Sequence, residues 1–313
     1  MKINIIFVLL CSLIPESVYA EKCASRMYTL DPIEGYYHSK YAPSPQDMFY
    51  ISEAFVASID GADVEANQSR VPKVNYLAQP HWVATHLKAY QQKDGSYGYA
   101  PGIERPNQWY RDNVFDSART TSGSNKRLDE SYTGSGSMWN RGHWAQRADA
   151  NRMGPEYGCN THTFANAFPQ AAAFNQGIWL GLENYISGLS NQLGELWIVT
   201  GPIFTKELGF IGDSDEVPVA IPDKAFKVVI WEHEGDIETL AFIYPNIPNA
   251  PDYKTGKCSR DESYDHSKYY ASITEIEDLT GLEFFDKERI ELKQKRTVSL
   301  PYVKKKFWVG SCR

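Results

Sequence analysis

The sequence predicts a single domain of the α+β class, because strand-like and helix-like segments occur in mixed order. Four short runs rich in Val, Ile, Trp or Phe and bounded by turn residues are typical of strands: residues 81–87, 195–200, 226–232 and 239–244. Two further segments, one beginning at residue 175 and one at residues 274–280, have apolar residues at helical spacing. Strands and helices do not alternate regularly, which favours this class over a doubly wound parallel sheet.

The two expected helices differ in how they end. After Asn175, apolar residues recur at 178, 182, 185, 186 and 189, which is the spacing of one buried helix face. Residues 274–280 are followed by Gly281, a residue type that commonly ends a helix. Residues 94–137 are rich in Gly, Ser, Pro, Asn and Tyr, which indicates irregular surface structure. The sequence has no internal repeat and no long linker, so residues 21–313 are expected to form one domain.

Length and charge limit the classes of function. The chain has 313 residues, of which 42% are hydrophobic, and this is enough to bury a substantial core. Its 32 basic and 39 acidic residues give a net charge of −7. This balance argues against a strongly basic protein held on nucleic acid by bulk electrostatics. Any phosphate site must therefore be local.

Residues 1–20 are typical of a secretory signal peptide. Lys2 supplies a positive charge, residues 5–14 form an apolar run, and Val18 and Ala20 are small residues before a cleavage point at Glu21. The apolar run is too short to span a bilayer, which takes about 20 residues. We therefore expect a soluble protein, secreted to the extracellular space or the periplasm, without a membrane anchor.

The cysteines then fit an oxidising compartment. Cys11 lies in the signal segment, which leaves Cys23, Cys159, Cys258 and Cys312, an even set that favours two disulfides. A zinc site is the rival interpretation, but no CxxC pair occurs and the only metal-like spacing joins Cys159 to His162. Three pairings are possible from the sequence. We favour Cys258 with Cys312, because both are late in the chain, and this leaves Cys23 with Cys159.

Residues 139–183 carry the candidate chemistry. His143 follows Arg141-Gly142, and a histidine after a tight glycine turn can present a neutral imidazole as a general base. Asn175 begins a helical pattern, where an amide oxygen can bind a hard cation. Taken singly, His143 is more often an ordinary structural histidine and Asn175 an N-cap. Their combination predicts a metal-assisted site that would be completed by a phosphate.

Helix geometry separates the roles of Asn175 and Glu183. On one regular helix, eight residues correspond to about 12 Å along the axis and about 80° around it. Both side chains can therefore hardly bind one ion directly. Because Mg²⁺ keeps several waters, we expect Glu183 to hold a metal-bound water rather than to bind the metal directly. A solvated helix charge is the alternative interpretation of Glu183.

The window resembles the DNA/RNA non-specific endonuclease family, a secreted, sugar-non-specific group of the ββα-metal type. The motifs that carry the resemblance are RGH at 141–143 with Asp149, NAFPQ at 166–170, and NQG at 175–177 with Glu183. Later segments match in the same order: WIVTGPIF at 197–204, IPDKAFKVV at 221–229, AFIYPN at 241–246 and SITEIEDLTGLEFF at 272–285. The resemblance covers about residues 75–285.

The resemblance implies a central antiparallel sheet flanked by helices, with a β-hairpin and a helix around one Mg²⁺, for which Mn²⁺ can substitute. It implies that His143 is the general base and that Asn175 binds the metal directly, with Glu183 acting through water. Arg141 would contact phosphate or support the hairpin, and Asn166 occupies a further position that the family uses at its site. DNA and RNA would be the substrates, and the products would carry 5′-phosphates.

Three positions depart from the family pattern. Asn140 replaces the usual Asp, and Gln146 replaces a frequent Pro. His86 takes the place of an arginine that grips substrate phosphate, and a neutral imidazole is a poorer phosphate partner than a guanidinium. These departures keep open a second hypothesis, a secreted nucleic-acid-binding protein that has the fold but no turnover. A third is phosphodiesterase chemistry on a small nucleotide or a lipid head group.

Overall fold

The computed structural model describes residues 37–44, 48–59, 79–106, 109, 128–133, 138–213, 216, 218–248, 250, 253, 264–285 and 289–310. The expected signal peptide lies outside the described residues, as do Cys23, Cys258 and Cys312. Among the residues that the structure describes, no helix has the length and apolar character needed to cross a bilayer.

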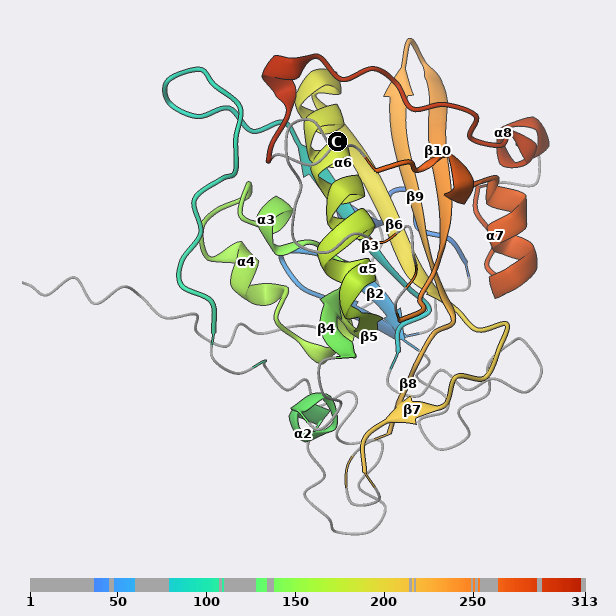
Figure 1. Ribbon diagram of the computed structural model, residues 1–313. Coiled ribbons are helices and arrows are strands. Elements are labelled where there is room, and N and C mark those ends of the chain that lie inside the picture. The colour runs from blue at the N-terminus through green and yellow to red at the C-terminus, as the bar shows by residue number, and fades with distance from the viewer. Residues whose placement is uncertain are drawn as a thin grey trace, which may run out of the picture.

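A seven-stranded antiparallel sheet forms the centre of the described structure (Figure 1), with the strand order β1-β2-β3-β6-β9-β10-β11. Its strands are β1 (Met48–Ile51), β2 (Val56–Ile59), β3 (Trp82–Lys88), β6 (Glu195–Ile203), β9 (Lys224–His233), β10 (Asp236–Pro245) and β11 (Tyr270–Ala271). The four expected strands are therefore confirmed as β3, β6, β9 and β10. Two small sheets pair β4 (Trp139–His143) with β5 (Ala167–Ala171) and β7 (Phe210–Ile211) with β8 (Val219–Ala220).

Helices cover both faces of the central sheet. They are α2 (Leu128–Thr133), α3 (Arg147–Ala150), α4 (Tyr157–Asn160), α5 (Ala172–Phe174), α6 (Leu180–Leu193), α7 (Ile273–Thr280) and α8 (Ile290–Gln294). Short turns are η1 (Tyr37–Ser39), η2 (Phe164–Asn166), η3 (Asn175–Trp179, π-helical), η4 (Ser267–Tyr269) and η5 (Lys305–Phe307). The expected α+β class, with a central antiparallel sheet flanked by helices, is confirmed.

The alternation of side chains along the strands divides the core into two layers. In β6, Leu196 and Ile198 belong to the same buried cluster as Leu182 of α6. Val199 of the same strand belongs to a second cluster with Ile276 of α7. Because successive side chains of a strand point to opposite faces, α6 and α7 lie on opposite faces of the sheet.

Helix α7 begins and ends as its sequence predicts. Ser272 Oγ accepts from the Glu275 backbone N–H at 3.2 Å, and Glu275 Oε2 accepts from the Ser272 N–H at 2.6 Å, which is a capping box. Gly281 follows with φ 71°, a left-handed conformation that glycine adopts without strain. Among the described residues of the 94–137 segment, the structure adds α2, which is too short for periodicity to reveal.

Cys159 is buried in α4 and is disulfide-bonded. Its partner lies outside the described residues, because no other cysteine is among them. A disulfide sulfur offers no thiolate, so this bond disfavours the zinc interpretation of Cys159 and His162. The pairings of Cys23, Cys258 and Cys312 remain predictions.

Candidate active site

A β-hairpin-like pair followed by a helix gathers the predicted site residues. Strand β4 pairs antiparallel with β5 in a register that places Gly142 opposite Phe168 and His143 opposite Ala167. The chain then continues from β5 through α5 and η3 into α6. Figure 1 shows β4 and β5 beside the end of this helical segment at which α5 lies. The arrangement is the ββα unit that the resemblance implies.

Gly142 is required because the Gln170 side chain lies directly over it. A Cβ atom at residue 142 would lie 2.3 Å from Gln170 Oε1 and 2.6 Å from Gln170 Cβ. Any larger residue would have to displace the Gln170 side chain. Gly142 thus helps to set the position of the backbone immediately before His143.

Asn166 fixes the backbone just after His143. Its Oδ1 accepts from the Ala145 N–H at 2.7 Å, and its Nδ2 donates to Ala145 O at 3.0 Å and to Thr161 O at 2.9 Å. The side chain is fully buried. Asn166 is therefore a positioning residue, because its amide is used by the backbone rather than presented to a ligand.

A cleft of about 730 Å³ lies over this unit. His143, Asn175, Glu183 and Arg141 all line it, so the structure brings together four of the predicted site residues. Two further arginines, Arg105 and Arg147, lie in the same wall. These three guanidinium groups give the local positive charge that an acidic protein needs in order to bind phosphate.

His143 is neutral and has one enclosed ring nitrogen. Burial holds the pKa of His143 well below its usual range, and the nearby His162 and the three arginines lower it further. Nε2 is enclosed and has no hydrogen-bond partner among the described residues. His143 lines the cleft and is partly exposed, and Nδ1 is not among the enclosed nitrogens. A neutral imidazole with an accessible lone pair is suited to accept a proton.

Asn175 and Glu183 line one cleft but do not lie on one regular helix. Gly177, between them, has φ −109° and ψ −113°, which interrupts the helix where η3 precedes α6. The expectation of a regular helix from residue 175 was therefore wrong. The separation of about 12 Å between Asn175 and Glu183, which assumed that helix, does not apply. A π-helical turn at a functional position is a recurrent feature of proteins.

The donor atoms fit a hard cation. The Asn175 side chain is partly exposed and makes no hydrogen bond within the described part of the chain. Burial raises the pKa of Glu183 to about 7 and Asp149 adds to this, while Lys227 opposes it. A cation in the cleft would favour the ionised carboxylate. The described residues contain no cluster of three or more His, Cys, Asp or Glu side chains suited to a metal.

Arg141 is held among aromatic rings at the edge of the cleft. Its guanidinium carbon lies 5.5 Å from the Trp109 and Tyr132 ring centroids and 5.8 Å from that of Phe164. Stacking of this kind orients a guanidinium. Arg141 is thus placed to contact a phosphate in the cleft.

His86 is not brought to the cleft. On β3, His86 pairs with Trp197 and its ring packs 4.6 Å from the Trp197 ring and 3.7 Å from the Tyr37 ring. Its Nε2 lies 2.9 Å from Glu195 Oε2, and burial lowers its pKa to about 4. The neighbouring Leu87 belongs to the α6 side of the core, so His86 points to the opposite face. The expected contact between His86 and substrate phosphate is therefore not supported by the structure.

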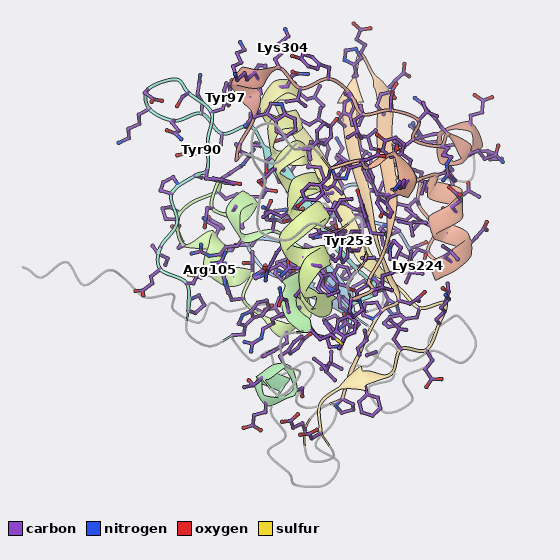
Figure 2. The ribbon with its side chains drawn as sticks, in the orientation of Figure 1. Tyr90, Tyr97, Arg105, Lys224, Tyr253 and Lys304 are labelled. Atoms are coloured by element: carbon purple, nitrogen blue, oxygen red, sulfur yellow. The ribbon has the colours of Figure 1, made fainter. Side chains whose placement is uncertain are left out.

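Two cleft residues, His162 and Trp109, were missed by sequence reasoning. His162 and Trp109 pack around His143, with ring centroids 5.0 Å and 4.5 Å from the His143 ring. Arg105 lies on the 99–106 segment (Figure 2), in the stretch interpreted as irregular surface. The only signal in the sequence was the Cys159–His162 spacing, which pointed to the wrong chemistry.

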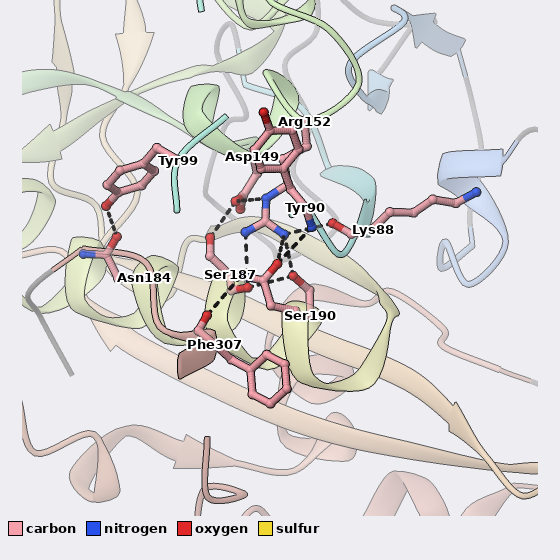
Figure 3. Close-up of polar contacts among 10 residues, drawn as sticks. Lys88, Tyr90, Tyr99, Asp149, Arg152, Asn184, Ser187, Ser190 and Phe307 are labelled. Atoms are coloured by element: carbon pink, nitrogen blue, oxygen red, sulfur yellow. Dashed lines mark hydrogen bonds and ion pairs between the residues drawn. The ribbon is translucent and has the colours of Figure 1, made fainter. Parts of the chain in front are cut away.

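Behind the cleft, a hydrogen-bond network joins α3 to α6 (Figure 3). Arg152 Nη1 donates to Ser190 Oγ at 2.7 Å and to Lys88 O at 2.8 Å, and Nη2 donates to Ser187 O at 3.2 Å. Asp149 Oδ1 accepts from Ser187 Oγ at 2.6 Å. This network fixes the part of α6 that follows Glu183.

Comparisons with known proteins agree with this geometry. The mitochondrial nuclease EXOG of Xenopus laevis is 30% identical over 166 residues, which are 50% of this chain and 43% of that protein. Nuclease C1 of Cunninghamella echinulata var. echinulata is 29% identical over 217 residues, covering 66% of this chain and 75% of that protein. The match thus spans about half the length of several curated relatives.

A solved structure shares the fold. The crystal structure of the EndoG/EndoGI complex superposes with a TM-score of 0.54 and 20% sequence identity over 76% of this chain and 85% of that chain. A sequence model described as DNA/RNA non-specific endonuclease matches residues 55–289. With most of the chain matched, and with the ββα unit placing its motif residues around one cleft, this protein belongs to the DNA/RNA non-specific endonuclease family.

Proposed function

We propose that this protein is an endonuclease that hydrolyses phosphodiester bonds of DNA and RNA with little sequence preference and uses Mg²⁺ as its cofactor. The observation that carries the proposal is the neutral His143, which reaches a cleft shared with Asn175, Glu183 and three arginines. Family membership supports nuclease chemistry, and the oxygen donors support a hard cation.

The chain's own residues have distinct roles in this proposal. His143 accepts a proton as a water oxygen attacks phosphorus and the bond to the 3′-oxygen breaks, which leaves the phosphate on the 5′ side. Arg141 binds a non-bridging phosphate oxygen and thereby aligns the scissile bond. Asn166 and Gly142 hold the His143 backbone in place.

Asn175 would hold the cation directly, and Glu183 would hold its waters. When bound, Mg²⁺, or Mn²⁺ in its place, would stabilise negative charge on the phosphate and on the leaving oxygen. Three arginines of the cleft are suited to contact phosphate, and contacts to phosphate carry no sequence information, which supports low specificity.

A plasmid assay tests the function. Supercoiled DNA and single-stranded RNA are incubated with purified protein in Mg²⁺, in EDTA, and in EDTA followed by excess Mg²⁺. We expect cleavage of both substrates in Mg²⁺, none in EDTA, and recovery on re-addition. Product 5′ ends should accept label from polynucleotide kinase only after phosphatase treatment. Binding without cleavage would instead support the non-catalytic hypothesis.

We also propose that the protein is exported after cleavage near Ala20. The proposal rests on residues 1–20 and on the disulfide at Cys159, since disulfides persist in oxidising compartments. N-terminal sequencing of the native protein should begin at Glu21. An uncleaved or much longer removed segment would contradict the secretory interpretation and favour a different destination, as in the relatives described as mitochondrial.

A further inference from the structure

We propose that Lys304, Lys305 and Lys306 form an outer nucleic-acid-binding surface, the lysine surface, which contacts the phosphate backbone of DNA or RNA beyond the cleft. This proposal deepens the proposed function, because it makes long nucleic acids, rather than short nucleotides, the preferred substrate. The part that concerns turnover rests on the proposed function. The part that concerns binding rests only on the positions and charges of the described residues.

The six basic side chains of residues 293–306 fall into two groups. Each member of the first group forms an ion pair with a glutamate: Lys293 with Glu277, Lys295 with Glu238, and Arg296 with Glu275. The second group is the lysine surface, whose three residues are exposed and form no ion pair with any described residue. The described part of the chain therefore neutralises the first group and leaves the second available to another molecule.

The backbone that carries the lysine surface is fixed to the end of α6. Gln192 Oε1 accepts from the Lys304 N–H at 2.9 Å, and Gln192 Nε2 donates to Tyr302 O at 2.9 Å. Asn191 Nδ2 donates to Phe307 O at 3.0 Å. The three lysines are thus presented from an ordered segment, which lowers the entropy that is lost when a ligand binds.

The surroundings of the lysine surface are positive, although the whole chain has a net charge of −7. Residues 297–310 and residues 184–194 contain no Asp or Glu. Tyr302 is 78% exposed and places an aromatic ring beside the lysines in the sequence. Basic side chains with an exposed aromatic ring are the combination with which proteins bind nucleic acid without sequence preference.

Helix α6 connects the lysine surface to the cleft. Asn184 accepts a hydrogen bond from the Tyr99 hydroxyl (Figure 3), and Tyr99 lines the cleft. Asn191, which holds Phe307, follows seven residues later, about 10 Å along the helix axis and only about 20° around it. A distance of about 10 Å corresponds to about three base-pair steps of a duplex. A duplex that occupies the cleft can therefore also reach the lysine surface.

The 97–105 segment follows the same route. The Tyr97 ring packs 4.9 Å from the Phe307 ring, next to Lys306, and Arg105 at the other end of the segment lines the cleft. Figure 2 shows Arg105, Tyr97 and Lys304 in this order along one side of the molecule. Positive charge also attracts an anionic membrane. The continuity with arginines that are suited to contact phosphate in the cleft favours nucleic acid.

The salt dependence of DNA binding tests the lysine surface. A labelled duplex of about 20 base pairs is titrated with protein in Ca²⁺ over a series of NaCl concentrations, and log Kd is plotted against log salt. The test variant combines Lys304→Gln, Lys305→Gln and Lys306→Gln. The matched control combines Lys293→Gln, Lys295→Gln and Arg296→Gln, which changes the net charge equally but removes only paired side chains.

We expect the slope to fall by about 0.9 for each lysine that contacts phosphate, hence by up to about 2.7 in the test variant, and to stay at the wild-type value in the control. Equal slopes in all three proteins would overturn the proposal. An equal fall in both variants would also overturn it, because net charge alone would then explain the binding. Unchanged DNA binding with loss of binding to phosphatidylcholine–phosphatidylserine vesicles would assign the surface to a membrane instead.

Turnover in Mg²⁺ provides a second measurement. The test variant should show a raised KM for plasmid DNA with kcat close to that of the wild type, and unchanged KM and kcat for a dinucleotide, which occupies only the cleft. A raised KM for the dinucleotide would show damage to the cleft and contradict the separate role of the lysine surface. A changed salt slope in a protein that cleaves nothing would uphold the surface and refute only the hydrolytic function.

Discussion

Helix α6 and the segment leading to it carry two polar regions that differ in how their hydrogen bonds are used. Around Arg152, the polar atoms of Ser187, Ser190 and Asn191 are paired within the protein. In the cleft, the Asn175 amide makes no hydrogen bond within the described residues and His143 Nε2 has no partner there. The paired set around Arg152 holds the fold, whereas the two cleft groups leave polar atoms that a ligand can meet.

The largest expected effect is on the structural region. Replacing Arg152 with Met removes a buried guanidinium from several acceptors and leaves Asp149 without its ion pair at 3.6 Å. Breaking a buried charge network in this way costs about 3–5 kcal/mol. Urea denaturation of Arg152→Met should show this loss in the free energy of unfolding. A change below about 0.5 kcal/mol would mean that the network does not hold α3 on α6.

In the cleft, we expect a substitution to lower activity rather than stability. Asn175→Ala removes an amide that nothing in the described fold uses, so stability should change little. Loss of a metal ligand should lower activity at low Mg²⁺ by about a hundredfold, with partial recovery at high Mg²⁺. Initial cleavage rates across a Mg²⁺ series measure this. An unchanged half-saturating Mg²⁺ concentration would remove Asn175 from the metal site.

Buried histidines predict a pH dependence of stability that belongs to the fold rather than to the cleft. Burial lowers the pKa of His266 from 6.5 to about 4, so the unfolded chain binds the proton more readily than the folded one. Stability is therefore complete above the unfolded pKa and falls as pH drops from 6.5 towards 4. For His266 alone the loss between pH 7 and pH 5 is about 2 kcal/mol. Between pH 7 and pH 5, the free energy of unfolding of His266→Asn should fall by about 2 kcal/mol less than that of the wild type. An equal fall in both proteins would contradict the assignment.

The fold was largely predictable because its signals are local. Each of the four predicted strands contributes apolar residues to both core layers. Helix α7 is bounded by its own capping residues, Ser272 and Gly281. Element α2 and the interruption at Gly177 were not predictable, since both depend on packing rather than on periodicity.

The site was predictable only where a motif kept its residues close in the chain. His143, Asn175 and Glu183 belong to one ββα unit, so residues that are near one another in the sequence are also near one another in space. The expectation for His86 was not supported because its ring packs against Trp197 and Tyr37 on the face of the sheet away from α6, and neighbouring side chains of a strand point to opposite faces. His162 and Trp109 reach the cleft through tertiary packing that no spacing in the sequence indicates.

The contrast between His143 and His86 gives the most direct test of the account. His143→Asn and His86→Asn are compared with the wild type in one plasmid cleavage assay, with DNA binding measured in parallel in Ca²⁺. We expect His143→Asn to lose about 10²- to 10⁴-fold in turnover while it still binds DNA, because phosphate contacts come from other groups. His86→Asn should keep turnover close to that of the wild type, with any loss confined to stability. Full activity in His143→Asn, or loss of turnover in a stably folded His86→Asn alone, would contradict the assignment of the cleft as the active site.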